Sequence, residues 1–270
     1  MRPYATSEIA GENPIGGGDY SVIYGRGWDG NPELAASQSR ATARRLLPLV
    51  IEAVGGPPKT VVDVGCNTGI FLQEFQRLGV ESVLGLDGEW VPRERLQIPT
   101  PAFRAVDLRK PVALPEHFDL AMSLEVAEHL EPEYADTFVD SLVSLAPIVL
   151  FSAALPLQRG THHVNCRWPE YWAEKFRARG YVPIDCLRDQ LLPLPDVGHP
   201  YAMNTILYVA RETLPKHPTL QGRLDPRMTR VPIKIRTEDH PLAWMANRLP
   251  PLPREWLFYV SRRLLRHSPI

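Results

Sequence analysis

Two short segments of the chain carry side chains that can move protons. The run Glu-Val-Ala-Glu-His ends with Glu128 and His129, and the run from 161 to 172 contains His162 and His163 together with an asparagine and two tryptophans. Imidazole titrates near neutral pH, and aromatic rings pack against sugars and other rings. We predict a general base among these residues, His162 or His163 first, with Glu128 and His129 as alternatives.

Plainer interpretations of both segments stay open on sequence alone. Acidic residues at 125 and 128 also suit the solvated start of a helix, where the helix dipole favours negative charge. A lone histidine is usually structural. Two carboxylates and an imidazole would also suit a divalent metal ion, but the sequence alone does not require one, and we predict no metal ligands.

A third group of residues suits a ligand that contains a nucleoside. The apolar strand Thr60–Val64 leads into the turn Gly65–Gly69, and an amphipathic helix follows. Glycine permits a sharp turn and the close approach of a ligand, and the first N–H groups of the helix are free to bind it. Asp87 closes the next strand, just before Gly88, where a carboxylate can accept both hydroxyls of a ribose.

Two details disfavour a nicotinamide dinucleotide. Its fingerprint is G-x-G-x-x-G, whereas Cys66, Asn67 and a threonine separate Gly65 from Gly69. Asp63, inside the strand before the turn, would repel a pyrophosphate and suits a cationic ligand. An oxidoreductase built on the same sheet remains a rival interpretation.

A sheet must bring these groups together. β-rich and helical runs alternate from residue 59 to about 211, which predicts an α/β fold: a Rossmann-like, parallel, seven-stranded sheet with helices on both faces. The predicted strands are Thr60–Val64, Ser82–Asp87, Phe103–Val106, Phe118–Leu124, Ile148–Ala153, Val182–Cys186 and Thr205–Ala210. The predicted helices are Gly69–Leu78, Glu133–Leu145 and Pro169–Arg179, with an earlier helical pattern from Ala43 to Val54 that stops at Gly55.

Changes in amino-acid composition and in the pattern of predicted elements divide the chain into three regions. Residues 1–58 form an N-terminal lid segment and helix, residues 59–211 the main domain, and residues 212–270 a Pro-rich extension with eleven Lys/Arg against five Asp/Glu. Tyr20, Tyr24 and Trp28 would cover the ligand or pack on the core. The extension would wrap the core, form a homodimer contact or meet an acidic partner, and Arg254–Arg266 has the pattern of a docking helix, with a membrane surface as the alternative.

Composition narrows the choice of partner, cellular location and structural class. The 270 residues are 44% hydrophobic and 23% charged with a formal net charge of -1, which gives no whole-chain attraction to nucleic acid or to an anionic membrane. The sequence shows no run typical of a signal peptide or a membrane span, so a cytoplasmic protein is expected. Three cysteines without a C-x-x-C pair argue against a disulfide framework and a cysteine zinc site.

Taken together, the motifs resemble class I S-adenosylmethionine-dependent methyltransferases. The run from Thr60 to Gly69 resembles their motif I, apolar-apolar-acidic-apolar-Gly-x-Gly-x-Gly, with Asn67 at the middle glycine, and asparagine tolerates a positive φ. Ala105-Val-Asp107-Leu108 lies where the family has an acidic residue that meets adenine, with a simple turn residue as the alternative. Phe118–Leu124 looks like the fourth strand, and Glu125–Leu130 resembles the E-x-x-E-H segment of members that act on small molecules.

The resemblance implies S-adenosylmethionine as co-substrate. Its binding residues are then expected to be Asp63, Gly65, Cys66, Asn67, Gly69, Asp87, Gly88, Asp107, Leu108, Leu124 and Glu125. The segment H-H-V-N/W-P-x-Y-W is similar to segments of methyltransferases from glycan and natural-product clusters, which favours an oxygen of a small molecule or glycan as the methyl acceptor. The D/N/S-P-P-aromatic motif of base-methylating enzymes is missing, so nucleic acid is an unlikely partner. A nucleic-acid-directed enzyme using the basic tail, and a non-catalytic cofactor-binding module, are the alternatives.

Overall fold

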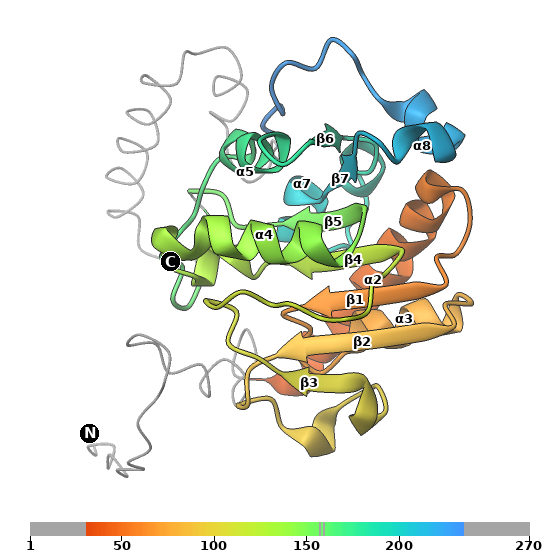
Figure 1. The fold of residues 1–270 in the computed structure, drawn as a ribbon. Coiled ribbons are helices and arrows are strands. Elements are labelled where there is room, and N and C mark those ends of the chain that lie inside the picture. Colours follow the sequence, from red (N-terminus) through yellow and green to blue (C-terminus); the bar gives the residue numbers. More distant parts are fainter. Residues whose placement is uncertain (1–30, 157, 159, 235–270) are drawn as a thin grey trace.

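The computed structural model describes residues 31–156, 158 and 160–234. Within them, seven strands form one sheet in the order β3-β2-β1-β4-β5-β7-β6 (Figure 1). The strands are β1 (Thr60–Val64), β2 (Ser82–Asp87), β3 (Phe103–Ala105), β4 (Leu120–Leu124), β5 (Ile148–Ser152), β6 (Tyr181–Ile184) and β7 (Ile206–Ala210). Each predicted strand is present, with its ends shifted by a few residues at most.

One strand corrects the prediction of a parallel sheet. β1 to β5 run parallel, but β7 lies antiparallel between β5 and β6, pairing Phe151 with Ile206 on one side and Ile184 with Leu207 on the other. Residues 185–205 connect β6 to β7 and include the short helices α6 and α7, so the connection is long enough for a parallel crossover, yet the chain returns antiparallel. The sheet is therefore mixed, and β7 runs opposite to all the other strands.

Helices cover both faces of the sheet, as predicted (Figure 1). Two separate cores result, because successive strand residues point to opposite faces. Core residues from α2 and α3 pack on one face, and core residues from α4 and α5 pack on the other. The helices are α2 (Pro32–Val54), α3 (Ile70–Arg77), α4 (Ala135–Leu145), α5 (Pro169–Arg177), α6 (Arg188–Leu191), α7 (His199–Asn204) and α8 (Pro218–Arg223). Short 3-10 turns are η1 (Arg93–Arg95), η2 (Thr100–Ala102), η3 (Ala127–His129), η4 (Pro132–Tyr134) and η5 (Leu214–Lys216).

Helix α2 begins well before the stretch that predicted it. Asn31 caps the helix by accepting hydrogen bonds from the backbone N–H groups of Glu33 and Leu34, at 3.0 and 3.1 Å, and proline occupies the first helical position. The helix ends where expected, at Gly55, whose φ of 92° suits glycine. α2 packs against α3, and so it supports the helix that follows the glycine turn.

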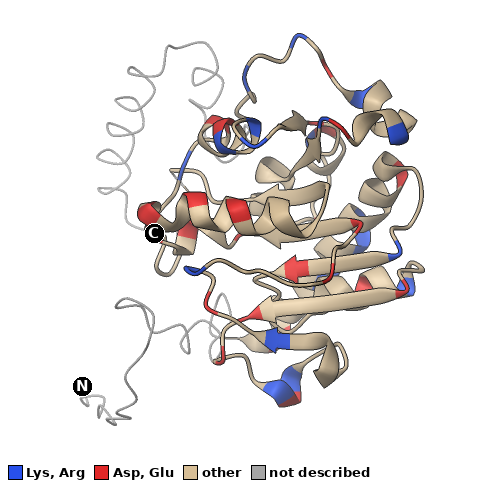
Figure 2. Ribbon diagram, in the orientation of Figure 1, with Lys and Arg blue, Asp and Glu red and all other residues tan. Residues whose placement is uncertain are grey.

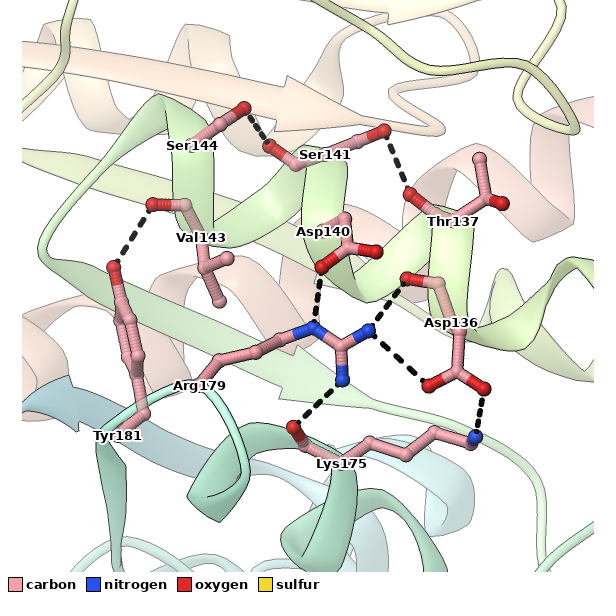
Figure 3. Close-up of polar contacts among 9 residues, drawn as sticks. All are labelled: Asp136, Thr137, Asp140, Ser141, Val143, Ser144, Lys175, Arg179 and Tyr181. Atoms are coloured by element: carbon pink, nitrogen blue, oxygen red, sulfur yellow. Dashed lines mark hydrogen bonds and ion pairs between the residues drawn. The ribbon is translucent and has the colours of Figure 1, made fainter.

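Polar side chains join α4 to the end of α5 (Figure 3). Arg179 donates to Asp140 at 2.6 Å and to Asp136 at 3.1 Å, while Lys175 donates to the other carboxylate oxygen of Asp136 at 2.7 Å. The hydroxyl of Tyr181, at the start of β6, donates to backbone carbonyls at the end of α4. These contacts hold α4 and α5 side by side, which fixes α5 at the end of the loop that carries the predicted histidines.

The described part of the C-terminal extension packs on the core. Leu214 and Leu220 join the core that contains α2, and Val231 joins the core beneath α4 and α5. Residues 212–234 therefore wrap the domain, one of the roles expected for the extension. No described helix is long and apolar enough to cross a membrane. The predicted aromatic lid of Tyr20, Tyr24 and Trp28 and the helix at 254–266 lie outside the described residues.

Candidate active site

The turn after β1 has the backbone shape that its sequence requires. Gly65, Asn67 and Gly69 have φ values of 91°, 50° and 80°, in the left-handed region. Asparagine tolerates this region better than most residues, so the departure from the glycine pattern at Asn67 leaves the turn intact. The backbone N–H groups of Gly65 and Cys66 both donate to the carbonyl of Leu86 in β2, which ties the turn to the next strand.

Gly65 also connects the turn to the acidic segment after β4. A Cβ atom at residue 65 would lie 2.4 Å from Cγ2 and 2.8 Å from Cγ1 of Val126. Real atoms never approach so closely, so glycine is needed here because Val126 occupies the space beside it. The predicted cofactor turn and the segment Glu125–His129 therefore lie in direct contact.

Two buried carboxylates lie at neighbouring strand ends. Asp63, next to last in β1, is 4% exposed, and Asp87, last in β2, is 3% exposed (Figure 2, red at both arrowheads). Burial, followed by the charge of Asp87, raises the pKa of Asp63 well above its ordinary value. Asp87 accepts hydrogen bonds from the backbone N–H groups of Asn67 at 2.8 Å and Gly88 at 2.7 Å. A cationic ligand at this edge would offset the repulsion between the two acids.

Asp107 has a different environment. It lies two residues beyond β3, and its carboxylate accepts two hydrogen bonds from the guanidinium of Arg109, both at 2.9 Å. The guanidinium lowers the pKa of Asp107. The same carboxylate accepts from the backbone N–H of Arg109 at 3.1 Å, a contact that suits a turn residue, and contact with adenine stays a prediction. Leu108 beside it is 7% exposed and packs in the core beneath α4.

Glu125 and Glu128 form an acid pair after β4, in which Glu128 is buried and Glu125 is partly buried. Leu124 ends the strand, and Glu125 follows with a φ of 56°, its backbone N–H donating to the backbone and hydroxyl oxygens of Ser152 in β5. Burial raises the pKa of Glu125 to about 7. Glu128 is 1% exposed, and burial together with the charge of Glu125 raises its pKa well above the ordinary value. The exposed helix start considered above is therefore wrong for Glu128.

The predicted histidines gather beside this acid pair. The rings of His129 and His163 lie edge to face with centroids 4.9 Å apart. Nδ1 of His129 lies 3.3 Å from the carbonyl oxygen of His162, and Nδ1 of His163 lies 3.2 Å from that of Gln158. A carbonyl can only accept, so these two contacts favour the tautomer with the proton on Nδ1 of each ring. Burial lowers the pKa of His129, to about 4, and that of His163.

Three residues of this region escaped the sequence analysis. Asn204, at the end of α7, donates to Glu125 at 3.2 Å and to Gln158 at 2.8 Å. Tyr201, also in α7, has its pKa raised by burial and then by the charges of Glu125, Glu128 and Asp63, so its hydroxyl stays protonated. The distance along the chain hid them, because residues of α7 carry no motif and approach β4 only through the fold.

The structure thus gathers most of the predicted site at one edge of the sheet. The turn, Asp63 and Asp87 form one group, and Glu125, Glu128 and the histidines form a second, with Val126 between them. Cys66 and Leu124 lie in the core at this edge, where burial raises the pKa of the Cys66 thiol. Asp107 and Leu108 extend the first group toward β3.

Comparison with known proteins agrees with the fold. A family model described as a methyltransferase domain matches residues 36–190, more than half of the chain. The structure is similar to DesVI of Streptomyces venezuelae, with a TM-score of 0.52, 14% identity and coverage of 71% of this chain and 98% of the other. It is also similar to the sugar N-methyltransferase KedS8 from Streptoalloteichus, with a TM-score of 0.52, 15% identity and coverage of 78% and 99%. No relative was found among curated proteins.

The residues at this edge fit the co-substrate of the matched family. S-adenosylmethionine carries an ammonium, a sulfonium and a ribose, and Asp63 and Asp87 supply the buried negative charge and the hydroxyl acceptor that such a molecule needs. Gly69, in the left-handed region, precedes α3, and no described side chain caps the first N–H groups of the helix. The chain belongs to the methyltransferase family, as a class I enzyme that uses S-adenosylmethionine.

Proposed function

We propose that the enzyme transfers the methyl group to a hydroxyl oxygen of a small molecule, such as a glycan or natural product. One observation carries the proposal: neutral imidazoles and the acid pair of Glu125 and Glu128 lie at the carboxyl ends of β4 and β5, next to the cofactor turn. A neutral alcohol is a poor nucleophile, so such an acceptor needs its proton removed. The cluster suits this step because burial lowers the pKa of His129 and of His163, which keeps these two imidazoles uncharged at neutral pH.

In this proposal, one group of residues binds the co-substrate and another removes the proton from the acceptor. When bound, S-adenosylmethionine supplies a methyl group on a sulfonium, and the acceptor must attack in line with the carbon–sulfur bond. Asp63, Asp87 and the turn Gly65–Gly69 hold the co-substrate. His162 and His163 remain the proposed bases, with Glu128 and His129 as alternatives.

Mutation of the proposed bases tests the proposal. A His162→Ala/His163→Ala variant is expected to lose about 10²–10⁴-fold in kcat, the usual contribution of a general base, and to keep its affinity for S-adenosylhomocysteine. His117→Ala is the control, because His117 is exposed and lies before β4 at the other end of the strand. Unchanged turnover in the double variant would end the assignment of the base.

Identification of the product tests the acceptor class. The enzyme is incubated with methyl-labelled S-adenosylmethionine and extracted metabolites or glycans, and labelled products are examined by mass spectrometry and NMR. A methyl ether supports the proposal. A methylamine product contradicts the oxygen target, labelled RNA or DNA contradicts the acceptor class, and no transfer to any fraction favours a cofactor-binding module. Binding of NAD in preference to S-adenosylhomocysteine would contradict the co-substrate itself.

A further inference from the structure

The acid–histidine cluster has the composition of a metal site. One ligand atom each of Glu128, His129 and His163 can be chosen so that all lie within 4.8 Å of one another. Ligand atoms around a tetrahedral ion such as Zn²⁺ are about 3.4 Å apart, so side-chain shifts on the order of 1 Å would bring this set to bonding distance.

Both imidazoles are held in the orientation that metal-binding histidines adopt. Such histidines donate one ring N–H to a carbonyl or carboxylate, which fixes the tautomer and leaves the other nitrogen to the ion. Nδ1 of His129 meets the carbonyl of His162, and Nδ1 of His163 meets that of Gln158. With Nδ1 engaged in this way, Nε2 of each ring is the atom that would bind an ion.

Polar atoms of the cluster are left over after the protein's own contacts are made. Oε2 of Glu128 is buried and has no hydrogen-bond partner among the described residues, and the same holds for Oδ1 of Asn204, whose amide nitrogen donates to Glu125. An orphaned buried carboxylate oxygen is costly and calls for an ion or a water molecule. Glu125 lies beside Glu128, so two carboxylates at the site can balance the two positive charges of a divalent ion.

We propose that Glu128, His129 and His163 bind one divalent first-row transition metal ion, with Glu125 balancing its charge from the adjacent position. Two nitrogens and one carboxylate suit Mn²⁺, Fe²⁺, Co²⁺ or Zn²⁺, whereas Mg²⁺ and Ca²⁺ prefer oxygen alone. Three protein ligands leave coordination positions open for an acceptor oxygen. Any role of the ion in methyl transfer rests on the proposed function, and ion binding does not.

The ion would also narrow the choice of base. Nε2 of His129 and of His163 would donate to the metal and could not take a proton from the acceptor. Of the residues proposed as bases, His162 is the histidine that remains. The ion itself would lower the pKa of a bound hydroxyl, as metals do for water.

Calorimetry on the metal-free, untagged protein tests the site without acceptor or co-substrate. Titration with Mn²⁺ is expected to show one ion per chain, and Co²⁺ is expected to give visible absorption typical of nitrogen ligation. His129→Ala, His163→Ala and Glu128→Gln should each lose more than about a hundredfold in Mn²⁺ affinity, since even residues behind metal ligands change it by about 10–100-fold. His117→Ala should bind as the parent does.

A fourth variant tests the geometry with every ligand kept. A Cβ at residue 160 would lie 2.0 Å from Nε2 of His163, so Gly160→Ala must displace the ring, and we expect Mn²⁺ affinity to fall about tenfold. Affinity for S-adenosylhomocysteine shows that each variant is folded.

Three results would overturn the site: no Mn²⁺ binding, tighter binding of Mg²⁺ than of Mn²⁺, or equal binding by the ligand variants and the parent. Loss of the metal proposal would leave methyl transfer untouched. Metal binding without any methyl transfer would overturn the proposed function alone.

Discussion

Substitution of Gly65 by alanine tests why the cofactor turn has its sequence. The new Cβ would meet Val126 at 2.4 Å, and the backbone φ of 91° is one that alanine rarely adopts. The left-handed conformation costs about 1–2 kcal/mol for a residue with a Cβ, and overpacking a filled site costs about 1–3 kcal/mol. The free energy of unfolding should therefore fall by about 2–5 kcal/mol.

Matched variants separate the two costs. Gly79 has a φ of 98°, and a Cβ there would meet nothing within 4 Å, so Gly79→Ala should lose only about 1–2 kcal/mol for the backbone conformation. Val126→Ala removes the methyl groups in conflict. When combined with Gly65→Ala, it should restore about 1–3 kcal/mol relative to the sum of the single changes.

Urea unfolding of the parent, the three single variants and the double variant measures these terms, and calorimetry with S-adenosylhomocysteine measures binding. Affinity for S-adenosylhomocysteine should fall in Gly65→Ala and stay unchanged in Gly79→Ala. Gly79 lies between α3 and the start of β2, at the opposite end of the strands from the cofactor turn. Equal destabilisation by Gly65→Ala and Gly79→Ala, together with no recovery in the double variant, would refute the argument that Val126 demands glycine.

Three further changes probe individual carboxylates and one buried cation. Asp63→Asn should weaken S-adenosylmethionine binding by about 1.5–3 kcal/mol. It should also stabilise the ligand-free protein at neutral pH: a raised pKa in the folded state makes stability fall as pH rises through the acidic range, and urea unfolding across that range should lose this slope. Asp107→Ala should weaken S-adenosylhomocysteine binding about tenfold if the carboxylate meets adenine, whereas Arg109→Ala should leave it nearly unchanged; equal small effects in calorimetry would favour the turn interpretation. Arg188→Met should cost about 3–5 kcal/mol in urea unfolding, because it leaves the buried Asp185 carboxylate without its main partner, and a loss below about 1 kcal/mol would contradict this.

The elements of the sheet were predictable because each leaves a local pattern. Short β-rich runs of four to seven residues identified all seven strands, and glycines marked helix ends. The direction of β7 was not predictable, since alternation along a strand is the same whichever way it runs. The start of α2 was missed although Asn31 and Pro32 give a capping signal. The four-residue α6 and six-residue α7 are too short for a helical period to register.

Part of the candidate site could also be predicted from local sequence patterns, and part could not. Gly65, Asp63 and Asp87 follow from spacing, because parallel strands bring their carboxyl ends to one edge. The burial of Glu128 could not be seen in sequence, since its five-residue run fits an exposed turn equally well. Asn204 and Gln158 were out of reach, because contacts between segments far apart in the chain leave no local pattern.

The antiparallel β7 has a consequence for the order in which the protein assembles. At the described edge of the sheet, β6 hydrogen-bonds to β7 and to no other strand, and β7 in turn fills the edge of β5. During synthesis β6 emerges before β7, so it must wait unpaired while β5 presents an open edge that invites aggregation. Asn204, which lies two residues before β7 and donates to Glu125 of the cluster, arrives in the same step. Completion of the sheet and completion of the acid–histidine cluster are thus one late event on the ribosome, and a chain halted near residue 200 would have neither.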